Sequence, residues 1–170
     1  GLIGFDMYRK TAGVIGTGQI GRILIQILNG FGMHVLAYDK FPNQAHADQI
    51  GFEYVALDDL YGQSDIISLH CPLTKETHHL INADSLQKMK SGVMIINTGR
   101  GHLIDSKALV DALRDQHVGA AGLDVYEEES EYFFEDFSTE VIDDDVLARL
   151  ISFPNVLITS HQGFFTREAL

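Results

Sequence analysis

The segment that most constrains the fold of this chain is a glycine-rich turn between an apolar run and an amphipathic run. The residues Ala12 to Ile15 lead into Gly16-Thr17-Gly18-Gln19-Ile20-Gly21, whose glycines have the spacing G-x-G-x-x-G. Apolar residues then recur at the spacing of a helix that buries one side, namely Ile20, Ile23, Leu24, Ile27 and Leu28. A strand, a tight turn and a helix in this order form the first unit of a nucleotide-binding α/β fold.

The three glycines and a later acidic residue have separate tasks in such a site. Gly16 permits the tight turn, Gly18 lets the backbone approach a pyrophosphate, and Gly21 lets the helix pack closely on the strand. The start of the helix offers backbone N–H groups to the phosphates. Asp39 ends the next apolar run, 18 residues after Gly21, where its carboxylate suits a ribose and would repel a 2′-phosphate. The pattern predicts a dinucleotide site that favours NAD over NADP. The alternative is a similar fold with an empty or different pocket, such as that of a methyltransferase.

The alternation of the remaining segments predicts a parallel sheet. Helical runs cover residues 57–61 and 82–90, and Asp105 or Ser106 is expected to cap a further helix. Strand-like runs cover residues 33–38, 52–55, 65–69, 93–96, 119–125 and 156–159. Repeated strand–helix alternation is typical of an α/β fold with a doubly wound parallel sheet, here in one domain over residues 1–170.

Composition and charge limit the partners. With 170 residues, 45% of them apolar, the chain can bury the core of one domain. The net charge of −12 argues against nucleic acid and against an anionic membrane, and no apolar run reaches the length of a membrane span. Cys71 is the single cysteine, which excludes an internal disulfide and favours a reducing, cytoplasmic compartment. Because the chain begins at Gly1 rather than Met, we expect it to be part of a longer protein.

One segment departs from the alternating pattern. Ten of the nineteen residues from Glu127 to Asp145 are acidic and none is basic, with four aromatic residues among them. We interpret the segment as a solvated loop anchored by its aromatic side chains, because charge runs usually mark solvated faces. A partner-binding surface is the less favoured alternative, and the carboxylates lack the regular spacing of a calcium loop.

Four reactive side chains follow predicted strands, at the edge where open α/β sheets bind ligands. Arg100 follows the strand at 93–96, Asp124 lies at the end of the next strand, Glu129 comes five residues later and His161 follows the last strand. Arginine binds a carboxylate through two parallel hydrogen bonds, and histidine exchanges a proton near neutral pH. A carboxylate beside the histidine fixes its tautomer and favours its charged form. Near a nicotinamide, these groups suit 2-hydroxy acid chemistry.

Each of these residues also has an ordinary structural interpretation. Alone, Arg100 is a surface cation, Glu129 is a solvated acid, and His161 is one of eight histidines. His70 and the pair His78-His79 are competing histidines, the first because it also follows a strand. The sequence contains no C-x-x-C, H-E-x-x-H or G-x-S-x-G pattern, so we expect neither a metal site nor a serine nucleophile.

Five motifs together resemble the NAD-dependent D-2-hydroxyacid dehydrogenase family over essentially the whole chain. They are Gly16-Thr17-Gly18-Gln19-Ile20-Gly21, Ser68-Leu69-His70-Cys71-Pro72-Leu73-Thr74, Asn97-Thr98-Gly99-Arg100-Gly101, Gly122-Leu123-Asp124-Val125-Tyr126-Glu127 and Ser160-His161-Gln162-Gly163-Phe164-Phe165-Thr166. The acidic segment and the residues around His161 look most like the fermentative D-lactate dehydrogenase branch. The resemblance implies a Rossmann-type NAD-binding domain of an oxidoreductase that reduces pyruvate to D-lactate.

The resemblance also implies roles for individual residues. Arg100 would bind the substrate carboxylate and carbonyl, His161 would donate the proton, and Glu129 would pair with His161. The intervals of 29 and 61 positions from Arg100 to these two residues fit the family. Asp124 would hold the nicotinamide amide. The other cofactor contacts would come from Gly16, Gly18, Gln19, Ile20, Gly21, Asp39, Cys71, Pro72, Thr77, Thr98, Gly99 and Arg100.

Two residues depart from the family pattern. Cys71 replaces a valine or leucine and is expected to be a small apolar wall without thiol chemistry, and Gly163 stands where alanine is frequent.

The family's substrate domain is absent from this sequence, and residues 1–8 look like the join to it. We therefore expect the isolated chain to be inactive, and the family suggests a homo-oligomer, at least a dimer. The alternatives are a bulkier or phosphorylated 2-keto acid as substrate, and a dinucleotide-sensing module similar to corepressors.

Overall fold

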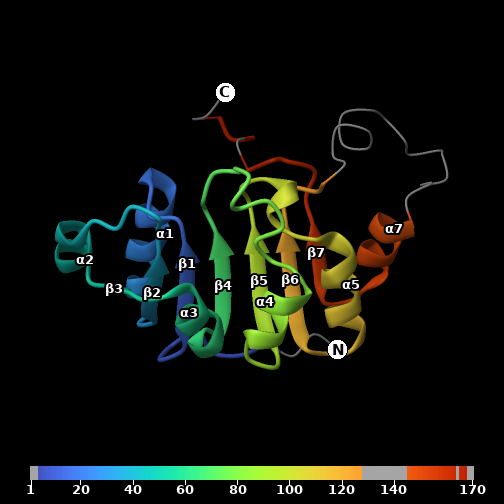
Figure 1. Cartoon of the computed structure of the whole chain (residues 1–170), viewed down its shortest axis with the longest axis horizontal. Coiled ribbons are helices and arrows are strands. Elements are labelled where there is room, and N and C mark those ends of the chain that lie inside the picture. The colour runs from blue at the N-terminus through green and yellow to red at the C-terminus, as the bar shows by residue number, and fades with distance from the viewer. Residues whose placement is uncertain (1–3, 128–144, 164, 168–170) are drawn as a thin grey trace.

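A seven-stranded parallel sheet with helices on both faces forms the structure (Figure 1). The computed structural model describes residues 4–127, 145–163 and 165–167. The strands are β1 (Thr11–Ile15), β2 (His34–Tyr38), β3 (Glu53–Tyr54), β4 (Ile66–Leu69), β5 (Val93–Asn97), β6 (Val118–Leu123) and β7 (Val156–Ile158). Their order is β3-β2-β1-β4-β5-β6-β7, and every neighbouring pair is parallel. The predicted α/β fold with a doubly wound parallel sheet is confirmed.

The strand order reverses between β1 and β4. The chain runs outward from β1 through β2 to β3, then returns to place β4 on the other side of β1. The connections after β1 and β4 therefore leave the sheet in opposite directions, and ligands of such sheets bind in the crevice between them. The backbone N–H of His70 donates to the carbonyl of Ile15 at 2.7 Å, which joins the two strand ends below this crevice.

Helices form where the sequence supplies caps and an apolar side. The helices are α1 (Gln19–Gly30), α2 (Gln44–Ile50), α3 (Leu57–Gln63), α4 (Ala83–Lys88), α5 (Ser106–Arg114) and α7 (Asp145–Ser152), with a 3₁₀ turn, η1, over Gly101–Leu103. Asp105, one of the two predicted caps, accepts hydrogen bonds from the backbone N–H groups of Lys107 and Ala108, both at 3.1 Å. Asn82 caps α4 in the same way. These bonds satisfy N–H groups that have no partner within the helix.

Two helices were not predicted from the sequence. In α2, only Ala47 is buried, so the apolar pattern that would reveal a helix is nearly absent. This helix ends at Gly51, whose φ of 85° suits glycine. In α7, Leu147 and Leu150 are buried against the core, but the helix begins at Asp145, inside the acidic segment. We interpret the acidic segment from Glu127 to Asp145 as a solvated loop, but its residues 128–144 lie outside the described residues.

The two faces of the sheet are covered unequally. On one face, α3, α4, α5 and α7 contribute to a large core around Leu69 and Ile95. On the other face, α1 packs Ile25 and Leu28 against Val14 and Val35 in a smaller core. The predicted buried side of α1 is wrong at Ile20, Ile23 and Ile27, which are each more than half exposed. Each fully buried leucine or isoleucine contributes about 1.5–3 kcal/mol, so the larger cluster supplies most of the stability.

No helix in the described residues is long and apolar enough to cross a membrane.

Candidate active site

The glycine turn after β1 has the backbone geometry that the sequence predicts. Gly16 has a φ of +99°, and a Cβ atom there would lie 2.5 Å from the backbone of His70 and Cys71. A Cβ atom on Gly21 would lie 2.1 Å from the carbonyl oxygen of Gly16. Helix α1 can therefore pack this closely on the turn only with glycine at position 21. Both requirements are steric, and both place the start of α1 directly above the turn.

The start of α1 fits a phosphate group. A Cβ atom on Gly18 would have no described atom within 4 Å, so the space in front of the helix is open. Within the described residues, no side chain caps this helix at Gly18. The first N–H groups of α1, on Gln19 and Ile20 among others, therefore face that space with the positive end of the helix dipole. The residues present thus fit the pyrophosphate of a dinucleotide.

Asp39 follows β2 and is held by the glycine turn. Its Oδ2 atom accepts hydrogen bonds from the backbone N–H and the hydroxyl of Thr17, at 2.7 and 2.9 Å, and its Oδ1 atom accepts one from the N–H of Phe41 at 2.9 Å. Burial raises the pKa of Asp39, but these hydrogen bonds outweigh it, and the pKa is lowered overall. The carboxylate is therefore charged at neutral pH, as the predicted preference for NAD over NADP requires. Sequence analysis missed the role of Thr17.

A cavity of about 510 Å³ lies beside the glycine turn, at the reversal of the strand order. Five predicted cofactor residues line it: Gly16, Asp39, Cys71, Pro72 and Thr77. The structure adds residues that the sequence did not single out, namely Ile15, Tyr38, Lys40, Phe41, Leu57, Thr74, Lys75, Glu76 and Leu80. Apolar walls with a few charged groups at the rim are typical of a pocket for a nucleoside.

Two features of the cavity bear on its chemistry. Lys40 and Glu76 form an ion pair at 2.5 Å and join the segments after β2 and β4 across the lining. Burial raises the pKa of the Cys71 thiol to about 11, and the negative charge of Asp39 contributes in the same direction. The thiol is therefore protonated near neutral pH, which agrees with the expectation of a small wall residue without thiol chemistry.

The ends of β5, β6 and β7 are joined by hydrogen bonds through Asn97 and Asp124. The side-chain oxygen of Asn97 accepts from the N–H of Gly99 at 3.0 Å, and its amide donates to the carbonyl of Arg100 at 3.0 Å. The N–H of Asp124 donates to the carbonyl of Asn97 at 2.9 Å, and the N–H of His161 donates to the carbonyl of Asp124 at 2.8 Å. The loops that carry Arg100, Asp124 and His161 therefore meet at one edge of the sheet.

The buried carboxylate of Asp124 holds the loop after β7. It accepts hydrogen bonds from the hydroxyl of Thr159 at 2.5 Å and from the N–H groups of Gln162 and Gly163, both at 2.9 Å. Burial raises the pKa of Asp124, but these bonds and nearby His161 outweigh it and lower the pKa overall. His161 itself has a φ of 51°, a left-handed conformation that costs a non-glycine residue about 1–3 kcal/mol. Backbone strain of this kind is often found at active sites, where a side chain must be held in one orientation.

Arg100 stands at the same edge with an exposed side chain. Its Nη1 atom donates to the carbonyl of Gly99 at 2.8 Å, which leaves most of the guanidinium to solvent. Thr98 is exposed and Gly99 half-buried beside it, so both are accessible to a ligand. Glu129, the third residue predicted to be catalytic, lies outside the described residues. Its pairing with His161 stays a prediction.

The competing histidines have other partners. The Nε2 atom of His70 lies 2.8 Å from the hydroxyl of Ser68, and burial lowers the pKa of His70. This histidine is thus neutral and held under the glycine turn. His79 lies 2.5 Å from Glu127, and its ring stacks on that of His78 with centroids 4.0 Å apart. The expectation of no metal site stays a prediction.

Comparisons with known proteins agree with this geometry. Residues 1–163 match the family model described as the D-isomer specific 2-hydroxyacid dehydrogenase, NAD binding domain. A D-lactate dehydrogenase of Escherichia coli K12 is 57% identical over 170 residues, which cover all of this chain and 51% of that protein. The chain therefore spans about half the length of the curated relatives it matches.

Two solved structures are similar to this one. The structure titled as the pyruvate reductase of Chlamydomonas reinhardtii has a TM-score of 0.94 and 48% identity, over 99% of this chain and 52% of that one. A D-lactate dehydrogenase of Lactobacillus jensenii, solved with NAD⁺, has a TM-score of 0.90 and 38% identity, over 98% of this chain and 50% of that one. NAD is the cofactor that this family binds and that the cavity and glycine turn fit. The chain belongs to the D-isomer-specific 2-hydroxyacid dehydrogenases, whose NAD-binding domain it forms.

Proposed function

We propose that the protein reduces a 2-keto acid to a D-2-hydroxy acid with NADH, and that pyruvate is the substrate. One observation carries the proposal: the loops of Arg100, Asp124 and His161 are joined by hydrogen bonds at the edge of the sheet that also carries the glycine turn. Relatives named D-lactate dehydrogenase and pyruvate reductase support the choice of pyruvate. The same proposal assigns the protein to the fermentative D-lactate dehydrogenase branch of the family.

In this proposal, the residues of the chain bind and protonate the substrate. NADH, when bound, would supply the hydride for the keto carbon of pyruvate. Arg100 binds the carboxylate of the substrate and stabilises the negative charge that grows on the carbonyl oxygen. His161 donates a proton to that oxygen and so completes the hydroxyl group. Glu129 is proposed to stabilise the charged imidazole before transfer.

The proposed cofactor contacts follow the geometry of the site. The N–H groups at Gly18, Gln19 and Ile20 would bind the pyrophosphate at the open start of α1. Asp39 would accept hydrogen bonds from the adenosine ribose. The residues that would line the rest of the cofactor are Cys71, Pro72, Thr77, Thr98, Gly99 and Asp124, the last beside the nicotinamide amide.

A panel of 2-keto acids tests the proposal against its two alternatives. The full-length protein is mixed with NADH and with pyruvate, a branched 2-keto acid or a phosphorylated one, and oxidation is followed at the nicotinamide absorbance. Fastest turnover with pyruvate supports a D-lactate dehydrogenase, and chiral analysis of the product checks the D configuration. Faster turnover with another acid supports a different member of the family. Binding of NADH without any turnover supports a dinucleotide-sensing module.

We also propose that the protein forms a homo-oligomer, at least a dimer. Four apolar residues on or next to α1 are each more than half exposed, namely Ile20, Ile23, Ile27 and Phe31. Rows of exposed apolar side chains on one helix often mark a subunit contact. Light scattering on the double variant Ile23→Asp, Ile27→Asp should give a monomer, whereas Ile151→Asp, at an exposed position of α7, should not change the mass. Equal masses for all three proteins would contradict this interface.

The proposed location is the cytoplasm. It is supported by the single cysteine, which is free in the structure, and by the use of NAD in a fermentative reaction. Fractionation of the source cells, with activity measured in each fraction, tests it. Activity confined to the membrane or extracellular fraction would contradict it.

A further inference from the structure

Three histidines from two separate segments meet beside the candidate active site. In the described part of the chain, His78, His79 and His102 each offer a ring nitrogen, and these three nitrogens lie within 4.8 Å of one another. His78 and His79 come from the segment between β4 and α4, whereas His102 lies in η1, two residues after Arg100. The rings of His78 and His102 are also stacked, with centroids 5.6 Å apart.

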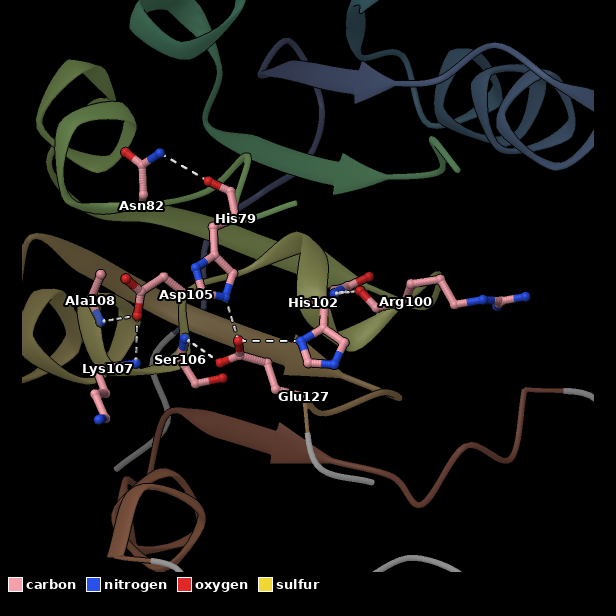
Figure 2. Close-up of polar contacts among 10 residues, drawn as sticks. His79, Asn82, Arg100, His102, Asp105, Ser106, Lys107, Ala108 and Glu127 are labelled. Carbon is pink, nitrogen blue, oxygen red and sulfur yellow. Dashed lines mark hydrogen bonds and ion pairs between the residues drawn. The ribbon is translucent and has the colours of Figure 1, made fainter. Parts of the chain in front are cut away.

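A carboxylate is fixed next to two of these three histidines. Oε1 of Glu127 lies 2.5 Å from Nε2 of His79 and 3.6 Å from Nδ1 of His102. Its other oxygen accepts a hydrogen bond at 2.9 Å from the N–H of Ser106, at the start of α5. Figure 2 shows both histidines directed at Glu127 from opposite segments, while the side chain of Arg100 points away. Burial raises the pKa of Glu127, but the bonds from Ser106 and His79 outweigh it, and the lowered pKa keeps the group ionised.

The backbone holds the two segments in place. The N–H of His79 donates to the carbonyl of His102 at 2.8 Å, so the segments stay joined whether or not the rings are occupied. His79 has a φ of 49°, a left-handed conformation that is unfavourable for a non-glycine residue and directs its ring toward Glu127. The side chains keep access to solvent, with 47% of His102, 35% of His79 and 17% of Glu127 exposed.

We propose that His78, His79 and His102, with the carboxylate of Glu127, form a binding site for a divalent transition metal ion. Imidazole nitrogens with one carboxylate oxygen are a ligand set that Zn²⁺ accepts, in tetrahedral coordination. Zn–N bonds of about 2.0–2.1 Å place tetrahedral nitrogens roughly 3.4 Å apart. To close on an ion, the exposed rings of His78 and His102 must rotate out of their stacked arrangement, and the 2.5 Å contact between His79 and Glu127 must open by roughly 1 Å. The ion takes the position of the proton that now joins His79 to Glu127.

Such an ion would link two functional segments. The segment that ends in His78 and His79 also carries Thr77 in the wall of the cofactor cavity, and His102 follows Arg100 by two residues. The bound metal would thus connect the cofactor cavity to the loop of Arg100 and restrain both. Because metal binds the folded form, an excess of about 100 times the dissociation constant should raise Tm by roughly 5 °C.

Zn²⁺ and Co²⁺ titrations of the purified protein test the site, with Co²⁺ as the spectroscopic probe. We expect one equivalent of Zn²⁺ by calorimetry and visible absorption bands of tetrahedral Co²⁺. His102→Gln and His78→Gln should each weaken Zn²⁺ binding at least about tenfold, and the double variant should lose the Co²⁺ bands. Glu127→Gln should weaken binding by about 10–100-fold, with circular dichroism as a check that α5 stays folded.

The control is His34→Gln, which changes an exposed histidine at the start of β2, at the opposite edge of the sheet. This variant should bind Zn²⁺ as the parent does. The proposal is overturned if the double variant still binds one equivalent with the parent affinity, or if His34→Gln weakens binding as much as His102→Gln. Because the readout is metal binding and not turnover, failure of this site leaves the proposed dehydrogenase activity unaffected.

Discussion

The two halves of the carboxyl edge of the sheet differ in how much of a site this chain completes. At β1, β2 and β4, a cavity of about 510 Å³ is lined by the glycine turn, Asp39 and the segment that begins at Cys71. At β5, β6 and β7, Asp124 is buried and organises the loops, but Arg100 is exposed and His161 only half-buried. The residues proposed to recognise the cofactor thus lie in this domain, whereas the proposed reaction needs a second surface to cover Arg100 and His161. The predictions below separate these two halves.

The largest effect is expected at His161, in the half that carries the reaction. Replacement His161→Gln in the full-length protein removes the proposed proton donor and should lower kcat at least about 10³-fold. NADH affinity should change less than about twofold, because the cofactor cavity does not include His161. Steady-state kinetics and fluorescence titration of NADH measure the two values. Normal turnover in this variant would remove His161 from the proposed role.

The next effect is expected at Gly21, in the half that binds the cofactor. A Cβ atom there meets the carbonyl of Gly16 at 2.1 Å, so Gly21→Ala must displace α1 from the turn. We expect a loss of roughly 2–3 kcal/mol in the free energy of unfolding, together with weaker NADH binding. Gly30→Ala is the matched control, because a Cβ atom at that end of α1 meets no described atom within 4 Å. Denaturant unfolding compares the two, and equal stabilities would contradict the close approach.

A smaller effect is expected at Asp39, on the choice of cofactor. Asp39→Ala removes a charge that repels a 2′-phosphate and a hydrogen-bond acceptor for the ribose. The ratio of kcat/KM for NADH to that for NADPH should fall by roughly 10–100-fold. Asp48→Ala, an exposed acid on α2, is the control and should leave the ratio unchanged. A ratio that stays the same in Asp39→Ala would mean that another residue sets the preference.

The smallest effect is expected at Cys71. Because its thiol is protonated at neutral pH, Cys71→Ser should change NADH affinity less than about threefold. In the parent protein, the rate of alkylation by iodoacetamide should rise with pH toward an apparent pKa of about 11, rather than near the ordinary value of 9.0. NADH should slow the reaction, since Cys71 lines the cavity. Fast alkylation at pH 7 would contradict the buried, protonated thiol.

The fold could be predicted because its signals are local. Apolar runs gave β1, β2, β4, β5, β6 and β7 within two residues of their observed ends, and the side-chain cap at Asp105 marked the start of α5. The end of β6 falls at Leu123 rather than Val125 because Asp124 turns to bind the loop after β7. In contrast, α2 has one buried residue and therefore lacks an apolar period. Helix α7 has such a period, with Leu147 and Leu150 buried, but it begins at Asp145 in the segment that we interpreted as an acidic loop.

The candidate site could be predicted only in part, because many of its contacts join distant segments. The glycine turn and Asp39 could be predicted from their spacing in the sequence. The family motifs identified Cys71, Arg100 and His161. The hydrogen bonds of Thr17 to Asp39 span 22 positions, and the ion pair of Lys40 with Glu76 spans 36. The three-histidine group forms only when η1 meets the segment before α4. No pattern in the sequence indicates such pairs.

The anchor at Asp124 has a consequence for redesign of the substrate preference. Its carboxylate holds the main-chain N–H groups of residues 162 and 163, so the side chain of Gln162 takes no part in those bonds. At Gly163, a Cβ atom would lie 3.0 Å from Oδ2 of Asp124, so even alanine requires the anchor to shift by a few tenths of an ångström. Libraries that vary the surroundings of the imidazole should therefore randomise position 162 and restrict position 163 to glycine and alanine.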